Sequence, residues 1–427
     1  MTAAPDPETD HGNRKPQILM LTHRVPFPPD RGDRIRSWNM LRHLADRADV
    51  SLACISDEPC DPQARQVLSE MCRRVVIAPV GPRVRWIRAG VLALGGSAMT
   101  EGLFWSRRLA RTLDHWADCT PFDVALVYCS SMLRYTRRRR LSVIPKVVDL
   151  VDADSQKWLD YATAAAPWKR PLYMAESRRI GRLERQSVLT SRAVTLVSDA
   201  EARVLRNALG IRQGNVYGLS NGVDTDYFSP QMSPTDNAGE SIRLAFVGAL
   251  DYFPNVDGLR WFAETVWPRL RQKHPGISLH VIGRNPNAQA RALETIAGIR
   301  VVGPVEDVRP SIAQAHAIIA PLRIARGIQN KVLEAMAMEK PVLATPEAAE
   351  GIDAIPDKEI VINRTVDDWV DTVSTLAEHP ELRKQFGIAA RQLVTEQYGW
   401  SQRLKPLDRL LGIETSVIEA LPVVPEQ

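Results

Sequence analysis

The first part of the chain alternates short apolar runs with amphipathic stretches. Residues 17–25 and 49–56 each hold an apolar run of strand length, and residues 33–47 between them have the spacing of an amphipathic helix. Two strands joined by a helical crossover are expected to be parallel. Similar strand-like runs follow at 73–80, 123–131 and 146–154, and residues 193–209 pass from a strand into a helix capped by Ser198 or Asp199. This pattern predicts a doubly wound α/β domain.

The same pattern restarts after a segment rich in Ser, Pro, Asn and Gly at 229–243. Strands are predicted at 243–250, 278–285, 315–323 and 340–345, with helices at 255–273 and 330–338. We therefore predict two tandem doubly wound Rossmann-like domains with a ligand cleft between them. The predicted divisions are a disordered tail (1–15), a first domain (16–230), a linker (231–242), a second domain (243–400), and a C-terminal helix and tail (401–427) packing back on the first domain.

Length and composition agree with this organisation. A chain of 427 residues is long enough for two cores, and 44% hydrophobic with 25% charged residues is typical of soluble globular proteins. The chain has no apolar run of membrane-spanning length, and its polar N-terminus is unlike a signal peptide. Five cysteines without metal-ligand spacing favour reduced thiols. These features predict a cytoplasmic protein without a metal site.

The net charge of +5 is unevenly distributed along the chain. Arg83, Arg85 and Arg88 surround Trp86, and residues 134–140 contain a second basic run. Both runs are compatible with ordinary solvated surface charge. They would also suit peripheral binding to an anionic membrane surface, such as the inner face of the plasma membrane. Neither run belongs to a nucleic-acid recognition module, so no nucleic-acid partner is expected.

Three cations lie just ahead of the predicted helix at 330–338. Arg323, Arg326 and Lys331 surround Gly327, which permits close approach of another group. The backbone N–H groups at the helix start, from Ile328 onward, attract anions. Arginines add charge-assisted hydrogen bonds to such a group. This arrangement predicts an anion site.

Lys331 and Glu334 are three residues apart and share one helix face. A cation at a diphosphate and a carboxylate at ribose hydroxyls one turn later would suit a nucleotide. The alternative is a local ion pair on a solvent-facing surface. The apolar surroundings of Glu334 in VLEAMAM place it near the buried side instead.

The chain resembles the retaining, nucleotide-sugar-dependent glycosyltransferases of family 4, which have the two-domain GT-B fold. The motifs that carry the resemblance occupy 219–230, 246–262, 301–322 and 330–345. Within that family the chain looks closest to the sugar transferases associated with bacterial exosortase and exopolysaccharide systems, through the stretches at 22–41, 148–158 and 326–336. The resemblance implies a hexosyltransferase that uses no metal or other cofactor. It would move a sugar from a nucleotide-diphosphate donor to a glycan or lipid-linked glycan acceptor.

Positions that match the family's motifs indicate candidate roles. Glu334 matches the glutamate that holds the ribose, and Gly32 falls in the glycine-containing loop that approaches the donor. Gly248 follows the first strand of the second domain, where many members carry a cationic pair that this chain lacks. Arg326 stands where the family's first signature glutamate is expected. Ser130 lies where many members have a histidine near the acceptor.

In place of the missing cationic pair, the cluster at the helix start is expected to stabilise the leaving diphosphate through Arg326 and Lys331. Arg323, Gly327 and Ile328 are the further donor-binding candidates there. Ser130 and Asp152 are the acceptor-side candidates. Asp152 and Asp154 also have the Asp-x-Asp spacing that holds a divalent metal in the other large glycosyltransferase fold. In a tandem doubly wound chain, a capping or acceptor-binding role for Asp152 is favoured.

Two other function classes remain open at this point. The same fold hosts nucleotide-sugar epimerases, although their usual acid/base set is not evident. A catalytically silent, nucleotide-binding scaffold is the second alternative, because Arg326 and Ser130 depart from the family's pattern.

Overall fold

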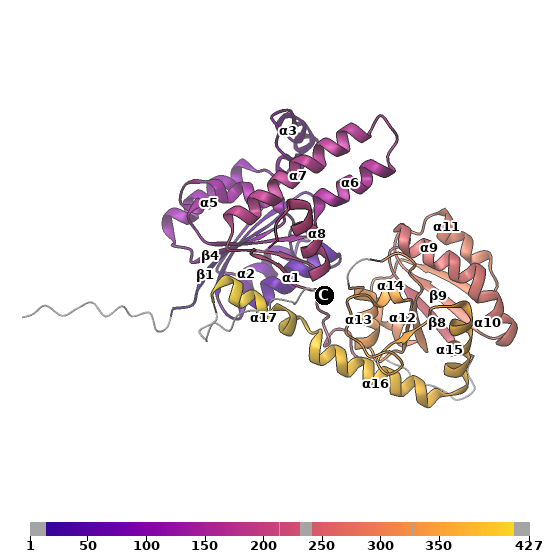
Figure 1. The fold of residues 1–427 in the computed structure, drawn as a ribbon. Coiled ribbons are helices and arrows are strands. Elements are labelled where there is room, and N and C mark those ends of the chain that lie inside the picture. The colour runs from indigo at the N-terminus through magenta and orange to yellow at the C-terminus, as the bar shows by residue number, and fades with distance from the viewer. Residues whose placement is uncertain (1–13, 213, 231–240, 326–327, 414–427) are drawn as a thin grey trace, which may run out of the picture. The chain divides into compact units, whose positions relative to one another are not determined.

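The computed structural model describes residues 14–212, 214–230, 241–325 and 328–413. The chain folds into two compact units, Met1–Leu219 with Leu404–Gln427, and Ser220–Arg403 (Figure 1). The chain therefore passes between the units at Leu219–Ser220, ahead of the linker predicted at 231–242. Residues 231–240 of that linker and residues 1–13 of the predicted tail lie outside the described residues.

A parallel sheet forms the centre of the first unit, with the strand order β3-β2-β1-β4-β5-β6-β7. Its strands are β1 (Gln17–Thr22), β2 (Asp49–Ser56), β3 (Arg74–Pro79), β4 (Val124–Tyr128), β5 (Lys146–Val151), β6 (Ala193–Leu196) and β7 (Val216–Gly218). The sheet grows from β1 in both directions, through β2 on one side and β4 on the other. The carboxyl ends of β1 and β4 thus form a topological switch point, where loops diverge to opposite faces.

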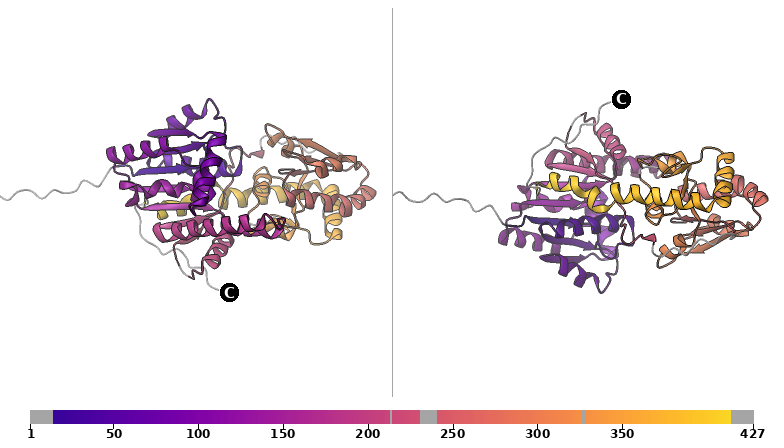
Figure 2. Two further views of the ribbon diagram at one scale, coloured as in Figure 1. Left: turned by 90° about the horizontal axis from the view of Figure 1, so that it is seen from above. Right: turned by 90° about the horizontal axis from the view of Figure 1, so that it is seen from below.

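Helices cover both faces of this sheet (Figures 1 and 2). They are α1 (Gly32–Ala45), α2 (Ala64–Met71), α3 (Pro82–Leu94), α4 (Met99–Leu103), α5 (Arg107–Cys119), α6 (Asp154–Ala164), α7 (Arg170–Thr190) and α8 (Asp199–Leu209), with the 3-10 helices η1 (Ser130–Arg137) and η2 (Arg139–Ser142). Helices α5, α7 and α8 share one apolar core with the sheet. Of the two capping candidates, Ser198 caps α8, because its side chain accepts a hydrogen bond from the Glu201 N–H.

A fully buried ion pair attaches α1 to the sheet. Arg36 Nη2 lies 2.6 Å from Asp149 Oδ2, and the Thr195 hydroxyl donates to the same oxygen at 2.8 Å. Both charged side chains are at most 1% exposed. Because each charge compensates the other, removal of either one would leave an unpaired buried charge.

The second unit repeats the doubly wound plan, with the strand order β10-β9-β8-β11-β12-β13. Its strands are β8 (Arg243–Val247), β9 (Ser278–Ile282), β10 (Ile299–Gly303), β11 (Ala317–Ala320), β12 (Val342–Ala344) and β13 (Val361–Ile362). Its helices are α9 (Phe253–Trp261), α10 (Trp267–Lys273), α11 (Ala288–Ala292), α12 (Arg309–Ala313), α13 (Asn330–Ala337), α14 (Pro346–Ala349), α15 (Val366–Glu378) and α16 (Pro380–Gln397), with the π-segment η4 (Phe262–Val266) and the 3-10 turn η5 (Leu293–Thr295). The helix predicted at 255–273 is thus built from α9, η4 and α10. The prediction of two doubly wound α/β domains is confirmed.

The last described helix, α17 (Trp400–Leu411), returns the chain to the first unit. There His43 Nε2 lies 2.8 Å from Asp408 Oδ1, which ties the end of α17 to α1. In the described parts of the chain, no helix combines the length and apolar character needed to cross a bilayer.

Candidate functional site

The candidate site of the second unit lies where its strand order reverses. Strand β8 is flanked by β9 and β11, so the loops that follow these strands leave one edge of the sheet. In doubly wound sheets, ligands bind outside the carboxyl ends of the strands at such a point. Helix α13 begins after the loop that follows β11, and it brings Lys331 and Glu334 to this region.

Lys331 is held against β8 and the first turn of α9. Its Nζ donates to Asn255 Oδ1 at 2.5 Å and lies 4.7 Å from the centre of the Phe246 ring. The Asn255 side chain is itself buried, and its Nδ2 donates to the Ala249 carbonyl at 2.8 Å. Burial lowers the pKa of Lys331 to about 7. An anion beside this ammonium group would restore its charge.

Glu334 lies one turn further along α13 and is partly buried. Burial raises the pKa of its carboxyl to about 7, and the charge of Lys331 opposes that shift. Among the described residues, its carboxylate makes no hydrogen bond, and Lys331 is not within ion-pair distance. The solvent-facing ion pair considered as an alternative is therefore not present. Glu334 remains available to bind hydroxyl groups.

Two glycines allow the backbone to pack closely around this edge. A Cβ atom on Gly248 would lie 2.8 Å from the Asn255 side-chain nitrogen, and one on Gly258 would lie 2.3 Å from the Pro321 carbonyl oxygen. Any side chain at Gly248 would therefore displace the residue that holds Lys331. Gly258 lets α9 approach the loop after β11.

The remaining donor-side candidates surround the start of α13. Arg323 is 54% exposed, and its Nη1 is 3.9 Å from Asp257 Oδ2, which leaves the guanidinium close to solvent. Ile328 packs against the core of the unit, and α13 starts without a side-chain cap. Arg326 and Gly327 lie outside the described residues, so their predicted roles stay predictions from sequence.

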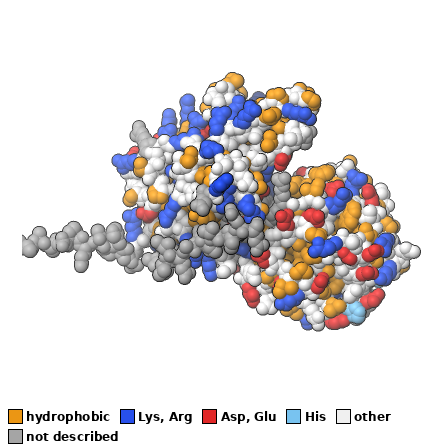
Figure 3. Space-filling view, in the orientation of Figure 1, with side chains coloured by type: hydrophobic (Ala, Val, Ile, Leu, Met, Phe, Trp, Pro, Cys, Tyr) orange, Lys and Arg blue, Asp and Glu red, His pale blue; other side chains and the backbone are white. Residues whose placement is uncertain are grey.

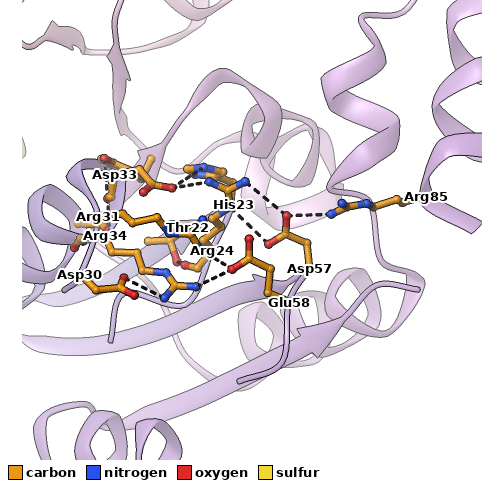
Figure 4. A network of polar contacts seen from close by, with 12 residues as sticks. Thr22, His23, Arg24, Asp30, Arg31, Asp33, Arg34, Asp57, Glu58 and Arg85 are labelled. Carbon is orange, nitrogen blue, oxygen red and sulfur yellow. Dashed lines mark hydrogen bonds and ion pairs between the residues drawn. The ribbon is translucent and has the colours of Figure 1, made fainter. Parts of the chain in front are cut away.

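Gly32 is the first residue of α1, with open space where a side chain would extend. The loop around it carries a network of ion pairs rather than unpaired cations (Figure 4). Arg24 Nη1 lies 2.7 Å from Asp33 Oδ2, and Arg34 Nη2 lies 3.2 Å from Glu58 Oε2. These charges stabilise the loop at the carboxyl end of β1. Access of a ligand to the Gly32 backbone remains a prediction.

The acceptor-side candidates follow adjacent strands of the first unit. Ser130 is buried at the start of η1, directly after β4. Asp152 follows β5, and Lys157 Nζ lies 2.5 Å from its Oδ2. Sequence reasoning did not find Glu184, which accepts a hydrogen bond from the Ser155 N–H at 2.9 Å and whose pKa burial raises to about 7. Across the described residues, no group of three or more His, Cys, Asp and Glu side chains could hold a metal ion.

The two basic runs of the first unit are not the continuous basic faces that the sequence suggests. Arg85 Nη1 lies 2.8 Å from Asp57 Oδ2, and Arg88 donates to the Gly102 carbonyl at 2.7 Å. In the second run, Arg137 Nη1 lies 3.1 Å from Glu101 Oε1, and Arg138 pairs with Asp114. Most of these cations therefore face partners in the same unit.

Sequence reasoning also missed two residues that contact Lys331. Asn255 and Phe246 contact the ammonium group directly. No local periodicity identifies these contacts, because they depend on the order of the strands.

Residues 241–379 match the family model described as glycosyl transferases group 1. This range covers the whole edge that holds Lys331 and Glu334. The second unit thus matches a glycosyltransferase domain. No curated protein matches the chain.

Solved structures similar to the chain cover nearly all of it. HepE of Anabaena in complex with UDP is 14% identical to this chain, with a TM-score of 0.61, and the match covers 93% of this chain and 99% of the HepE chain. A glycosyltransferase of Rickettsia africae is 14% identical, with a TM-score of 0.58, and the match covers 95% of this chain and 100% of the Rickettsia chain. Sucrose-phosphate synthase of Thermosynechococcus elongatus is 16% identical, with a TM-score of 0.63, and the match covers 92% of this chain and 98% of the synthase chain. The solved structures show that the whole chain shares their two-domain fold, and the family match concerns residues 241–379 alone.

Proposed function

We propose that the protein is a metal-independent, retaining hexosyltransferase. It moves a sugar from a nucleotide-diphosphate donor to a glycan or lipid-linked glycan acceptor during synthesis of an exopolysaccharide or another cell-surface polysaccharide. The observation that carries this proposal is the placement of Lys331 against Asn255, with Glu334 one turn along the same helix and without a hydrogen-bond partner among the residues that the structure describes. A diphosphate carries the charge opposite to that of the Lys331 ammonium group, and ribose hydroxyls can donate hydrogen bonds to the Glu334 carboxylate.

In the proposed donor complex, the diphosphate lies beside Lys331 and the start of α13, and Glu334 accepts hydrogen bonds from ribose hydroxyls. HepE of Anabaena has been solved with UDP and with UDP-glucose, and this makes a uridine nucleotide the first donor to test. Arg323 lies eight residues before Lys331 in the sequence, and its exposed guanidinium is proposed to bind the same diphosphate. These cations stabilise charge that develops on the leaving diphosphate.

Sugar transfer then requires no side-chain nucleophile. The acceptor hydroxyl attacks the anomeric carbon on the face from which the diphosphate departs, and its proton passes to the departing phosphate oxygen. The bond to the leaving oxygen breaks as the bond to the acceptor oxygen forms, so the anomeric configuration is retained. Ser130 and Asp152 of the first unit are proposed to bind the acceptor. The proposed location is the cytoplasmic face of an anionic membrane.

A thermal-shift panel of UDP, GDP, ADP and CMP, with and without EDTA, tests this proposal. A ligand that binds the folded protein raises its melting temperature by mass action. We expect one nucleoside diphosphate to give a shift that survives EDTA and is lost in Glu334→Ala. Lys384→Met, an exposed substitution on α16, is the matched control that should keep the shift. Absence of any nucleotide shift would instead support a different role for the second unit.

Turnover needs a separate measurement. Release of UDP from UDP-sugars can be followed without knowing the acceptor, because water can take the place of the acceptor hydroxyl as the nucleophile. Nucleotide binding without release from any UDP-sugar, even with added cell-envelope glycans, would favour a binding scaffold over an enzyme.

A further inference from the structure

Helix α3 carries an apolar stripe that faces solvent. Val84, Ile87, Val91 and Leu94 are 61%, 69%, 62% and 91% exposed, respectively. Their spacing of three, four and three residues places them on one side of the helix. An ordinary surface helix turns such a stripe toward the core. Here the stripe needs a partner outside the unit.

The opposite side of α3 is fixed to the protein. Ala89 is fully buried, and it packs so closely on α4 that a Cβ on Gly102 would lie 2.5 Å from its Cα. Arg85 and Arg88 also face this side, through the ion pair with Asp57 and the hydrogen bond to the Gly102 carbonyl. These contacts fix the orientation of α3. If α3 rotated to turn the apolar stripe toward the core, the contacts of Ala89, Arg85 and Arg88 would be lost.

A cavity of about 600 Å³ lies beside α3, between this helix, the end of β3, the start of α5 and η1. Its walls are largely apolar and include Val80, Leu92 and Trp105. Val84 also lines it, so the cavity adjoins the exposed stripe. The space is therefore continuous with an apolar surface that faces outward.

Three arginines line the same cavity. They are Arg88, Arg107 and Arg134. The Arg134 guanidinium lies 4.9 Å from the Trp105 ring, and Arg88 Nη2 is buried without a hydrogen-bond partner among the described residues. Within that same part of the chain, none of the three has a carboxylate within 4.0 Å. Burial lowers the pKa of Arg88, and Arg134 adds a smaller lowering that Tyr135 opposes.

These features require a ligand with two chemical parts. Grouped guanidinium groups without an acid favour a phosphate, which they can bind through paired hydrogen bonds. The apolar walls and the stripe favour hydrocarbon. We propose that the cavity binds the phosphate head group of an anionic membrane phospholipid while the stripe of α3 lies among the acyl chains of the same leaflet.

A second exposed apolar group lies on the same side of the first unit. Trp168, in the turn between α6 and α7, is 77% exposed, and Leu172, in the first turn of α7, is 54% exposed. Lys169 Nζ lies 4.8 Å from the centre of the Trp168 ring. Helix α3 and the α6–α7 hairpin both project from the upper side of the unit in Figure 1, and hydrophobic and basic side chains alternate along that edge in Figure 3. Tryptophan beside lysine or arginine is typical of membrane interfaces.

This inference deepens the membrane location in the proposed function and rests on it, but it does not depend on sugar transfer. Flotation with vesicles tests it. The full chain is mixed with phosphatidylcholine vesicles, with or without phosphatidylglycerol, and the floating fraction is measured. We expect the floating fraction to be at least tenfold larger with the anionic vesicles than with phosphatidylcholine alone. Binding to the anionic vesicles should fall as salt is raised, because salt screens surface charges.

Two variants test the contributions of the stripe and of the cavity to vesicle binding separately. Ile87→Asp with Leu94→Asp removes the stripe, and Arg107→Glu reverses a charge at an exposed position that makes no ion pair within the described residues. Each should reduce flotation at least tenfold and leave the UDP-induced thermal shift unchanged. Ile388→Asp, at a 47% exposed position on α16, is the matched control and should float like the wild type.

The source of the phosphate is tested by competition. A short-chain phosphatidylglycerol should release the protein from vesicles, whereas the same concentration of inorganic phosphate or UDP should not. Equal release by inorganic phosphate would overturn the lipid assignment, as would undiminished flotation of the Arg107→Glu variant. Loss of the UDP shift with normal flotation would instead count against the donor site and leave the lipid site standing.

Discussion

Replacing Lys331 by methionine is expected to weaken UDP binding and to remove most of its pH dependence above pH 7. Methionine preserves the length and apolar stem of the side chain but carries no charge. In the free protein, burial beside Phe246 and Asn255 lowers the pKa of Lys331 to about 7. A bound diphosphate would return the pKa toward about 10.4, the value of an unperturbed lysine. Binding would therefore take up a proton.

The size of the effect follows from these two pKa values. As pH rises above 7, the free protein must first protonate Lys331 before it binds the diphosphate, so the affinity falls. With a pKa of about 7 free and about 10.4 bound, the dissociation constant should rise about fivefold from pH 7 to 8 and about fiftyfold from pH 7 to 9. The larger change corresponds to about 2.3 kcal/mol.

Isothermal titration calorimetry with UDP in buffers of different ionisation enthalpy measures this proton directly. At pH 8 the wild type should take up about 0.9 protons per UDP bound, and Lys331→Met should take up far fewer. Glu334 titrates in the same range, because its pKa is also raised to about 7, so the difference between wild type and variant is the quantity to compare. Lys384→Met should behave like the wild type.

The reasoning would be refuted by a wild type that binds UDP without proton uptake. It would also be refuted if Lys331→Met kept the same affinity and the same pH profile. Either result would mean that the diphosphate does not lie beside Lys331, whatever nucleotide the protein binds.

Three further predictions concern stability. Arg36→Met should lower the free energy of unfolding by about 3–5 kcal/mol in urea titrations, because Asp149 is left as an unpaired buried charge, and adding Asp149→Leu should restore much of the loss. Gly258→Ala should lower the melting temperature and weaken UDP binding, since its Cβ would lie 2.3 Å from a backbone carbonyl oxygen, whereas Gly32→Ala, whose Cβ would meet nothing within 4 Å, should leave the melting temperature unchanged. Glu334→Gln should stabilise the free protein by ~1–3 kcal/mol at pH 8 and by little at pH 5. A carboxyl whose folded pKa is raised favours the fold when protonated and loses that advantage as pH rises through about 7; a stability difference independent of pH would contradict this.

Local pattern was sufficient for the strands that form the centre of each sheet. The apolar runs at 17–25 and 243–250 become β1 and β8, because strands covered on both faces need continuous apolar side chains. Capping by Ser198 was also predictable, since a hydroxyl ahead of a helical run is a local signal. The outward stripe of α3 was not, because apolar spacing identifies a helix face without saying what covers it.

Sequence by itself determined the two doubly wound domains and placed Lys331 and Glu334 on one helix face, because both depend on periodicities of a few residues. Only the tertiary structure decided which groups meet that face. Asn255 contacts Lys331 across 76 residues of sequence, and Arg36 contacts Asp149 across 113. Such pairs depend on the order of the strands in the sheet, since that order brings together elements that are distant in sequence. The resulting burial, rather than the residue types, shifts the pKa values of Lys331 and Glu334 toward 7.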